Sequence, residues 1–339
     1  MSLPDWARAH GAPLFAATMR AVPADFQVTE ELGYAFTGDG EHDFLYVEKT
    51  GANTEWVSRQ LARFADIPAK DVGYAGLKDR HAVTRQWFSV PRWNAPDWGA
   101  FEAEGVNILD VQRHNRKLRR GAHKANRFRI VLRAAGLSEQ VDAVEQRLRL
   151  IRAQGVPNYF GEQRFGHGGQ NLRLADDFAA GRRLPRHQRS IAISTIRSFQ
   201  FNDELHARVA GRSWNILLPG DTANLDGTGS VFDVPEVDEE LQRRCRELDI
   251  HPTGLLAGDG SDAGNRQWLA ALQKARVEPG TRSLRLRVAE MAWEIGESGL
   301  VLSFTLVRGA FATSVLRELA EISDASRRAG HSQEVPSPG

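Results

Sequence analysis

Apolar and polar residues alternate with a period of two in five short segments of the first half of the chain. Such alternation is typical of strands that bury one face. The two earliest segments read PADFQVTEEL and DFLYVEKTG, and the Gly-rich turn TGDGEH separates them. We therefore predict strands at 23–32, 43–51, 72–76, 85–90 and 128–133.

Other segments repeat their apolar residues at helical spacing. After Asn53, which can cap a helix, apolar residues between Trp56 and Phe64 fall on one face. Residues 138–155 have the same pattern and end in a glycine, as helices often do. A final helix is predicted to begin at Thr313 or Ser314, either of which can cap it.

Strand-like alternation returns late in the chain, where the segment from Ser283 gives two or three strands before the final helix. The region between, at 155–285, mixes helical patterns with Pro/Gly turns and an acidic segment. Because the ends of a compact domain tend to lie close together, the return of strands indicates an insertion. We predict an α+β protein with a second α/β domain at 155–285, inserted into a domain formed by 1–154 and 286–339.

The composition is that of a globular protein, with 41% hydrophobic and 26% charged residues in a chain of 339. A single cysteine, Cys245, excludes an intrachain disulfide and disfavours a cysteine-type zinc site, so we expect a reducing compartment, the cytoplasm. No apolar run approaches the ~20 residues of a membrane helix, and we expect neither a signal peptide nor an anchor.

Motifs for nucleotide binding and metal-dependent hydrolysis do not occur. The chain has no P-loop, no G-x-G-x-x-G that opens a helix after a strand, and no H-E-x-x-H. The Gly-rich stretch GHGGQN at 166–171 is better interpreted as a backbone turn than as a phosphate-binding loop. A nucleotide cofactor is therefore not expected.

Charge is unevenly distributed although the net charge is only +1. Residues 113–133 contain nine Lys or Arg and no acid, whereas residues 233–249 contain seven acids and three basic residues. Clustered cations repel one another and gain free energy when phosphates neutralise them, so we favour a nucleic-acid partner over a merely solvated face. The candidate backbone contacts are Arg113, Arg116, Lys117, Arg119, Arg120 and Lys124.

An acid between cations distinguishes the loop GLKDRHAVT. Asp79 lies between Lys78 and Arg80, and these neighbours favour its charged form, so it could act as a nucleophile. On local sequence alone, a solvated turn with weak surface ion pairs is the better interpretation.

Three further residues have ambiguous local signals. Asn126 could hydrogen-bond a base edge or could be an ordinary turn residue. Phe26 and Phe311 each lie at the edge of a turn, where loops carry function, although a lone Phe is usually a core residue.

Together the blocks VPADFQVTEEL, GYAGLKDRHAVTRQW, HNRKLRRGAHKANRFRIVLR, GVPNYFGEQRFG and RGAFATSVLREL resemble the tRNA pseudouridine synthase D (TruD) family, in the same order and over nearly the whole chain. The resemblance implies a pseudouridine-synthase fold, a mixed and mainly antiparallel sheet flanked by helices. It also implies an isomerase that converts uridine 13 of tRNA to pseudouridine, with no cofactor and no metal. The expected partner is tRNA, and we expect a monomer that does not bind membranes.

Carried over residue by residue, the resemblance implies that Asp79 is the catalytic nucleophile and that Phe26, Asn126 and Phe311 contact the substrate. The nucleotide must be flipped out of the folded tRNA, and Phe311 or Phe26 would stack on its base. The sequence does not distinguish among attack on C1′ of the ribose, attack on C6 of uracil and removal of the C2′ proton through a glycal. The possible charge partners of the nucleophile are Arg20, which stands where many members have Lys, Lys78, Arg80 and Arg308.

Two other functions are alternatives to a pseudouridine synthase. A tRNA-binding or folding factor without catalysis would keep the basic surface but would not need Asp79, and the intact GLKDRHAVT block argues against it. An RNA methyltransferase would need a Gly-rich turn after a strand for its methyl donor, and the chain has none.

Overall fold

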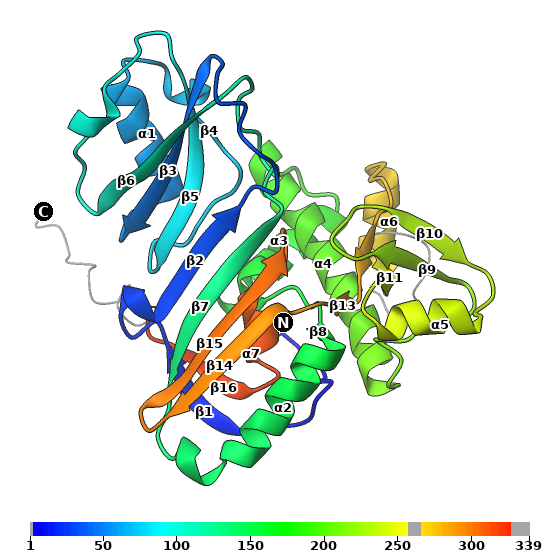
Figure 1. Ribbon diagram of the computed structural model, residues 1–339. Helices are drawn as coiled ribbons and strands as arrows, with labels where there is room; N and C mark the ends of the chain where they lie inside the picture. Colours follow the sequence, from blue (N-terminus) through cyan, green and yellow to red (C-terminus); the bar gives the residue numbers. More distant parts are fainter. Residues whose placement is uncertain (1–2, 257–265, 327–339) are drawn as a thin grey trace, which may run out of the picture. The chain divides into compact units, whose positions relative to one another are not determined.

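The computed structural model describes residues 3–256 and 266–326, which form two compact units (Figure 1). The sheet unit contains residues 14–143, residues 289–309 and the described residues from 320 onward. The helical unit contains the described residues up to 13, those within 144–288, and residues 310–319. The units thus divide the chain differently from the predicted domains, because the described residues up to 13 and residues 144–154, 286–288 and 310–319 group with the helical unit.

The sheet unit is built on one mixed sheet of ten strands among the described residues. Its principal strands follow the order β14-β15-β7-β2-β5-β3-β6, while β1 pairs with β16 and β7, and β4 pairs with β5. The pairs β2–β5 and β1–β16 are parallel and the others are antiparallel. This arrangement confirms the predicted α+β class with a mixed, mainly antiparallel sheet. The elements of the sheet unit are β1 (Phe15–Met19), β2 (Phe26–Glu31), β3 (His42–Thr50), α1 (Thr54–Phe64), β4 (Gly73–Tyr74), β5 (Val83–Pro91), β6 (Val106–His114), β7 (Ala125–Arg133), β14 (Ala289–Gly296), β15 (Gly299–Val307) and β16 (Ala320–Asp324).

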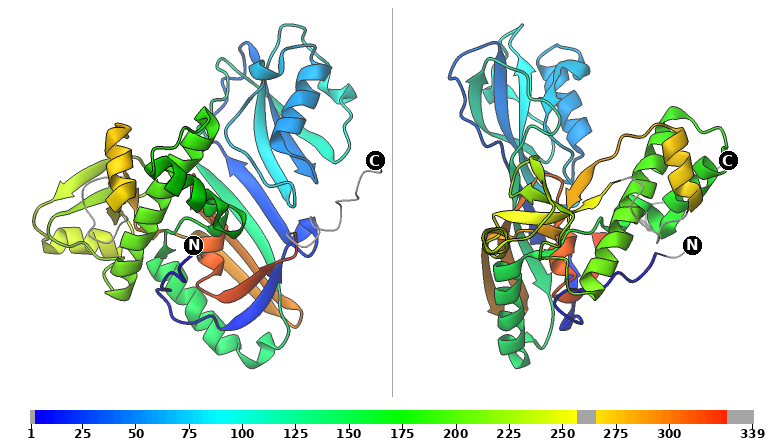
Figure 2. Two further views of the ribbon diagram at one scale, coloured as in Figure 1. Left: turned by 180° about the vertical axis from the view of Figure 1, so that it is seen from behind. Right: turned by 90° about the vertical axis from the view of Figure 1, so that its right-hand side faces the viewer.

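Helix α1 covers one face of the strands β3 and β5 (Figure 2). Leu45 and Val47 are fully buried on β3 and pack in one cluster with Val57 and Leu61 of α1. Since Leu45 and Val47 are two positions apart on a strand, their side chains leave the same face of the sheet. The next residue on this face is Lys49, which is also fully buried.

The helical unit combines helices with two small sheets. Helix α4 packs against α3 and β11, and α3 also contacts α6. A core of Phe165, Leu172, Ile196 and Trp268 joins these helices. The small sheets follow the orders β10-β9-β11-β12 and β13-β8. The elements are α2 (Val141–Gln154), which begins in the sheet unit, β8 (Val156–Pro157), α3 (Gln170–Ala179), α4 (Arg186–Ala210), β9 (Asp221–Leu225), β10 (Val231–Val234), α5 (Glu239–Arg246), β11 (Ile250–Leu255), α6 (Arg266–Lys274), β12 (Thr281–Ser283), β13 (Arg285–Leu286) and α7 (Ala312–Leu316).

The five predicted strands of the first half are confirmed as β2, β3, β4, β5 and β7. The predicted final helix is shorter and begins earlier than expected, because Phe311 is the N-cap of α7 and the chain has already entered β16 at Ala320. In the sheet unit, strands β1, β6 and β16 were not predicted. No helix of the described residues is long and apolar enough to cross a bilayer.

Candidate active site

The parallel pairing of β2 and β5 brings two distant loops together. Gln27, one residue into β2, lies beside Val83, the first residue of β5. In a parallel pair the strands begin at the same edge of the sheet. The chain that precedes β2, with Arg20 and Phe26, therefore meets the loop that precedes β5, with Asp79.

Arg20 is the cation that pairs with Asp79. Its Nη2 lies 3.0 Å from Asp79 Oδ2 and its Nη1 lies 2.6 Å from Asp324 Oδ2. Its guanidinium carbon lies 4.0 Å from the ring centroid of Phe26. The Arg20 side chain is 8% exposed. A guanidinium that bridges two carboxylates and rests on an aromatic ring is fixed in position more firmly than a single surface ion pair.

The backbone of Arg20 adopts an unusual conformation, with φ of 57°. Non-glycine residues seldom occupy this left-handed region, and such positions persist where the surroundings hold them. Here the bridge to Asp79 and Asp324 supplies that restraint.

The Asp79 carboxylate is held at both oxygens but is not covered. Its Oδ1 accepts a hydrogen bond of 2.9 Å from the backbone N–H of His81, while Oδ2 faces Arg20. The side chain is 30% exposed. Asp79 thus combines a fixed orientation with access from solvent, as a reacting carboxylate requires.

The other predicted charge partners of Asp79 have different contacts. Lys78 Nζ lies 2.7 Å from Glu30 Oε2, and both side chains are buried. Arg308 donates a hydrogen bond to the carbonyl of Gly121. Arg80 has an exposed side chain.

Asn126 lies on the same face of the sheet as Glu30, its partner in the register of β2 and β7. It is 8% exposed, and its Oδ1 has no hydrogen-bond partner among the described residues. A buried carbonyl oxygen without a donor costs free energy, so it can accept a bond from a ligand. The neighbouring Phe128 is instead a core residue that stacks on Phe304, with ring centroids 5.5 Å apart.

Phe311 belongs to the helical unit, whereas Asp79, Phe26 and Asn126 belong to the sheet unit. It is half-buried and its ring centroid lies 6.4 Å from that of Phe160. Three of the four residues that the family resemblance singles out therefore lie in the sheet unit, and the fourth lies in the helical unit.

The predicted RNA-backbone residues lie at the end of β6 and in the loop before β7. Arg113 donates to the Gly40 carbonyl at 2.7 Å, Lys117 to the Lys70 carbonyl at 2.7 Å, and Arg120 to the Tyr74 hydroxyl at 2.6 Å. These contacts hold the side chains without neutralising their charge. All six predicted residues are exposed: Arg113, Arg116, Lys117, Arg119, Arg120 and Lys124.

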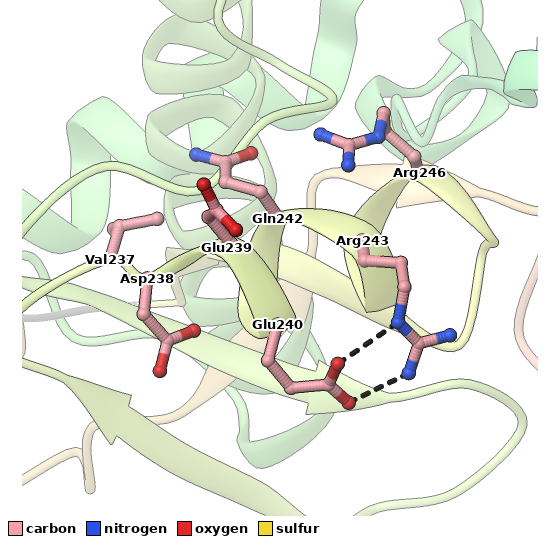
Figure 3. A pocket seen from close by; sticks show the side chains of 7 residues that line it. All are labelled: Val237, Asp238, Glu239, Glu240, Gln242, Arg243 and Arg246. Carbon is pink, nitrogen blue, oxygen red and sulfur yellow. Dashed lines mark hydrogen bonds and ion pairs between the residues drawn. The ribbon is translucent and has the colours of Figure 1, made fainter.

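The acidic segment of the helical unit neutralises its own cations. Figure 3 shows a hollow beside α5, with the carboxylate of Glu240 against Arg243. The two groups lie 2.7 Å apart, Arg243 also pairs with Glu247 at 2.7 Å, and Arg244 pairs with Asp249 at 2.6 Å. The predicted contrast in charge between the two segments is therefore present in the structure.

Three residues that contact the candidate site were not predicted: Lys49, Glu30 and Asp324. The first two have a signal in the sequence. Glu30 falls in phase with Phe26 on β2, as Lys49 does with Leu45 on β3, so a charged residue occupies a buried-face position in each strand. Asp324 has no signal in the local sequence. The parallel pairing of β1 and β16, two segments far apart in the chain, brings it to Arg20.

Comparison with known proteins gives one consistent result. The family model described as tRNA pseudouridine synthase D (TruD) matches residues 9–175 and 170–319. Proteins named tRNA pseudouridine synthase D are 45% identical in Methylococcus capsulatus and 46% identical in Ectopseudomonas mendocina, over 94% and 93% of this chain and 94% of each relative. A crystal structure from Methanosarcina mazei that carries the same name has a similar fold, with a TM-score of 0.68 at 19% identity over 95% of this chain and 96% of that one. The chain therefore belongs to the tRNA pseudouridine synthase D (TruD) family.

Proposed function

We propose that this protein isomerises uridine 13 of tRNA to pseudouridine, with Asp79 as the nucleophile on a flipped-out nucleotide. The observation that carries the proposal is the Arg20–Asp79 ion pair, in which a partly exposed carboxylate is oriented by a buried guanidinium. Isomerisation requires that the N-glycosidic bond break, that the base turn, and that a carbon–carbon bond form to the same ribose.

Asp79 acts as the carboxylate in this proposal. Arg20 orients the carboxylate and leaves the exposed side of Asp79 for the substrate. Attack on C1′ of the ribose, attack on C6 of uracil and removal of the C2′ proton through a glycal all require an ionised group at this place. Asn126, with its unpartnered Oδ1, would accept a hydrogen bond from the uracil or ribose.

The two predicted stacking rings have different surroundings. One face of Phe26 carries the Arg20 guanidinium, and the ring is only 4% exposed. We therefore assign Phe26 the role of supporting Arg20 beside the substrate. For Phe311 we keep the role that the family resemblance implies, stacking on the flipped base. The exposed cations at 113–124 would bind phosphates of the tRNA.

The test is a tRNA transcript with wild-type protein, the Asp79→Asn variant and the Asp66→Asn variant. Asp66 is an exposed aspartate of the same unit and serves as the matched control. Wild type and Asp66→Asn should form pseudouridine at position 13 and Asp79→Asn should not, as read by site-specific mapping. Product formation by Asp79→Asn at a rate close to wild type would reject Asp79 as the nucleophile.

A substrate deuterated at C2′ distinguishes the routes. Removal of that proton in the rate-limiting step would slow single-turnover conversion by a primary isotope effect. Equal rates with both substrates would instead favour direct attack by Asp79.

A further inference from the structure

Lys49 has an unusual place for a lysine. It lies on β3 opposite Thr84 of β5 and Val106 of β6, in the interior of the sheet, and is fully buried. Its side chain projects from the same face of the sheet as Leu45 and Val47. An apolar residue at position 49 would therefore extend the core.

Three backbone carbonyls surround the buried ammonium. Lys49 Nζ donates to Ala52 O at 2.8 Å, to Asp79 O at 2.9 Å and to Lys78 O at 3.4 Å. An ammonium group has three protons, so this set satisfies its donors. No other donor reaches the Lys78 and Asp79 carbonyls among the residues that the structure describes.

Burial of this charge is costly for stability. Removing an ammonium from water costs several kcal/mol, and carbonyl dipoles compensate only in part. Burial lowers the pKa of Lys49 to about 8, with the charge of Lys78 acting in the same direction and that of Asp79 opposing it. Lys78 is itself paired with Glu30. Packing of the core does not require an ammonium group at this position. The role of Lys49 therefore lies in its contacts with the loop that contains Lys78 and Asp79.

The rest of this loop is anchored at other points. Gln86 Nε2 donates to Gly76 O at 3.1 Å, and the Lys78 N–H donates to Thr54 Oγ1 at 2.9 Å. On the far side of Asp79, the Gly51 N–H donates to Arg80 O at 3.1 Å. The carbonyls of Lys78 and Asp79 accept their hydrogen bonds from Lys49 Nζ. Lys49 therefore holds the backbone of the loop at the nucleophile.

We propose that Lys49 is a positioning residue for Asp79: its buried ammonium fixes the backbone of the nucleophile loop and so places the carboxylate for attack. The inference rests on the proposed function. Lys49 does not touch the substrate, because its amine is buried against carbonyls, and it acts through Asp79 alone. A displacement of the carboxylate by ~1 Å can slow a reaction about 100-fold without weakening binding.

Lys49→Met tests the proposal because it keeps the length of the side chain and removes the charge and the donors. The control is Lys70→Met, an exposed lysine of the same unit. We expect Lys49→Met to lower the single-turnover rate about 100-fold while the Kd for a tRNA transcript changes less than about threefold. Lys70→Met should change neither. A rate for Lys49→Met within threefold of wild type, or a Kd that rises in parallel with the loss of rate, would overturn the proposal.

The pH profile of the rate supplies a second measurement, and its wild-type arm does not depend on the folding of a variant. As the ammonium deprotonates near pH 8, the single-turnover rate should fall, and Lys49→Met should lack this alkaline fall. A wild-type rate that stays level between pH 7 and 10, or the same alkaline fall in Lys49→Met, would overturn the proposal.

The two proposals fail in different ways. If the wild type forms no pseudouridine, the proposed function is wrong and the role of Lys49 with it. If the wild type is active, Asp79→Asn is inactive and Lys49→Met is as fast as wild type, only the inference about Lys49 is wrong.

Discussion

Arg20 joins Asp79 to Asp324, with one guanidinium nitrogen 3.0 Å from the first carboxylate and another 2.6 Å from the second. The two acids are separated by most of the chain, and the pairing of β1 with β16 makes their meeting possible. One buried cation thus orients the predicted nucleophile and ties the C-terminal strand to the same place.

Arg20→Met should lower the single-turnover rate of pseudouridine formation about 10- to 100-fold. Without the guanidinium, Asp79 loses its orienting partner and faces Asp324 as a like charge. Asp324→Asn should cause a smaller loss, because Arg20 keeps its contact with Asp79. If Asp324→Asn lost more activity than Arg20→Met, the pairing of Arg20 with Asp79 would not be the relevant contact.

Asn126→Leu should increase stability and decrease activity. The buried Oδ1 has no partner in the described structure, so its replacement by an apolar group of similar size should gain about 1 kcal/mol in the free energy of unfolding. The same change removes a group proposed to bind the substrate. Urea unfolding and single-turnover rates measure the two effects.

Asn158→Leu is the matched control for this prediction. Asn158 is also buried, but its amide donates to Ser283 O at 2.8 Å and accepts from Arg282 at 2.6 Å. Its replacement should destabilise the protein by about 1–3 kcal/mol, because bonded partners lose their contacts. Destabilisation by both variants would contradict an unpartnered Asn126.

Neutralising the exposed loop cations should weaken the salt dependence of tRNA binding. A triple change of Arg116, Arg119 and Lys124 to Gln removes three exposed charges. Each phosphate contact contributes about 0.7–0.9 to the log–log slope. The slope should therefore fall by about 2 to 3. Binding assays over a range of salt concentrations measure it.

The control for this surface is the triple change of Arg243, Arg244 and Arg246 to Gln. Arg243 and Arg244 are paired with carboxylates of their own segment, so they release few counterions on binding. We expect the slope of this variant to match wild type. An equal effect of both triple changes would place the RNA surface elsewhere.

The sequence predicted the central strands and the nucleophile loop because their signals are local. The alternation of β2 and β5 follows from one buried face, and GLKDRHAVT joins β4 to the start of β5. Strand β6 was missed because it is an edge strand with many exposed residues, so its apolar positions do not alternate cleanly. Strand β16 was missed because its residues continue the helical spacing of the segment before it.

The family resemblance placed Arg20 among the possible partners of Asp79, but the sequence could not select it from the other candidates. Flanking cations identified Lys78 and Arg80 as neighbours in sequence, but the fold turns Lys78 toward Glu30. The choice of Arg20 depends on which strands pair, and pairing between distant segments leaves no local pattern. Lys49 could have been noticed, since a lysine in phase with Leu45 and Val47 contradicts the buried face of its strand.

The stability difference between wild type and Lys49→Met should depend on pH. The pKa of Lys49 is lowered from 10.5 to about 8 in the folded protein, so between these values the unfolded chain binds more protons than the native state. The free energy of unfolding of the wild type should therefore rise relative to Lys49→Met as pH increases from 7.5 to 10, by at most about 3 kcal/mol. Other titrating groups are present in both proteins and cancel in the difference, which urea unfolding at several pH values measures. A difference that does not vary with pH would show that the fold does not lower the pKa of Lys49. Over the same range the proposed positioning role predicts a falling reaction rate, so loss of this one proton should make the protein more stable and less active.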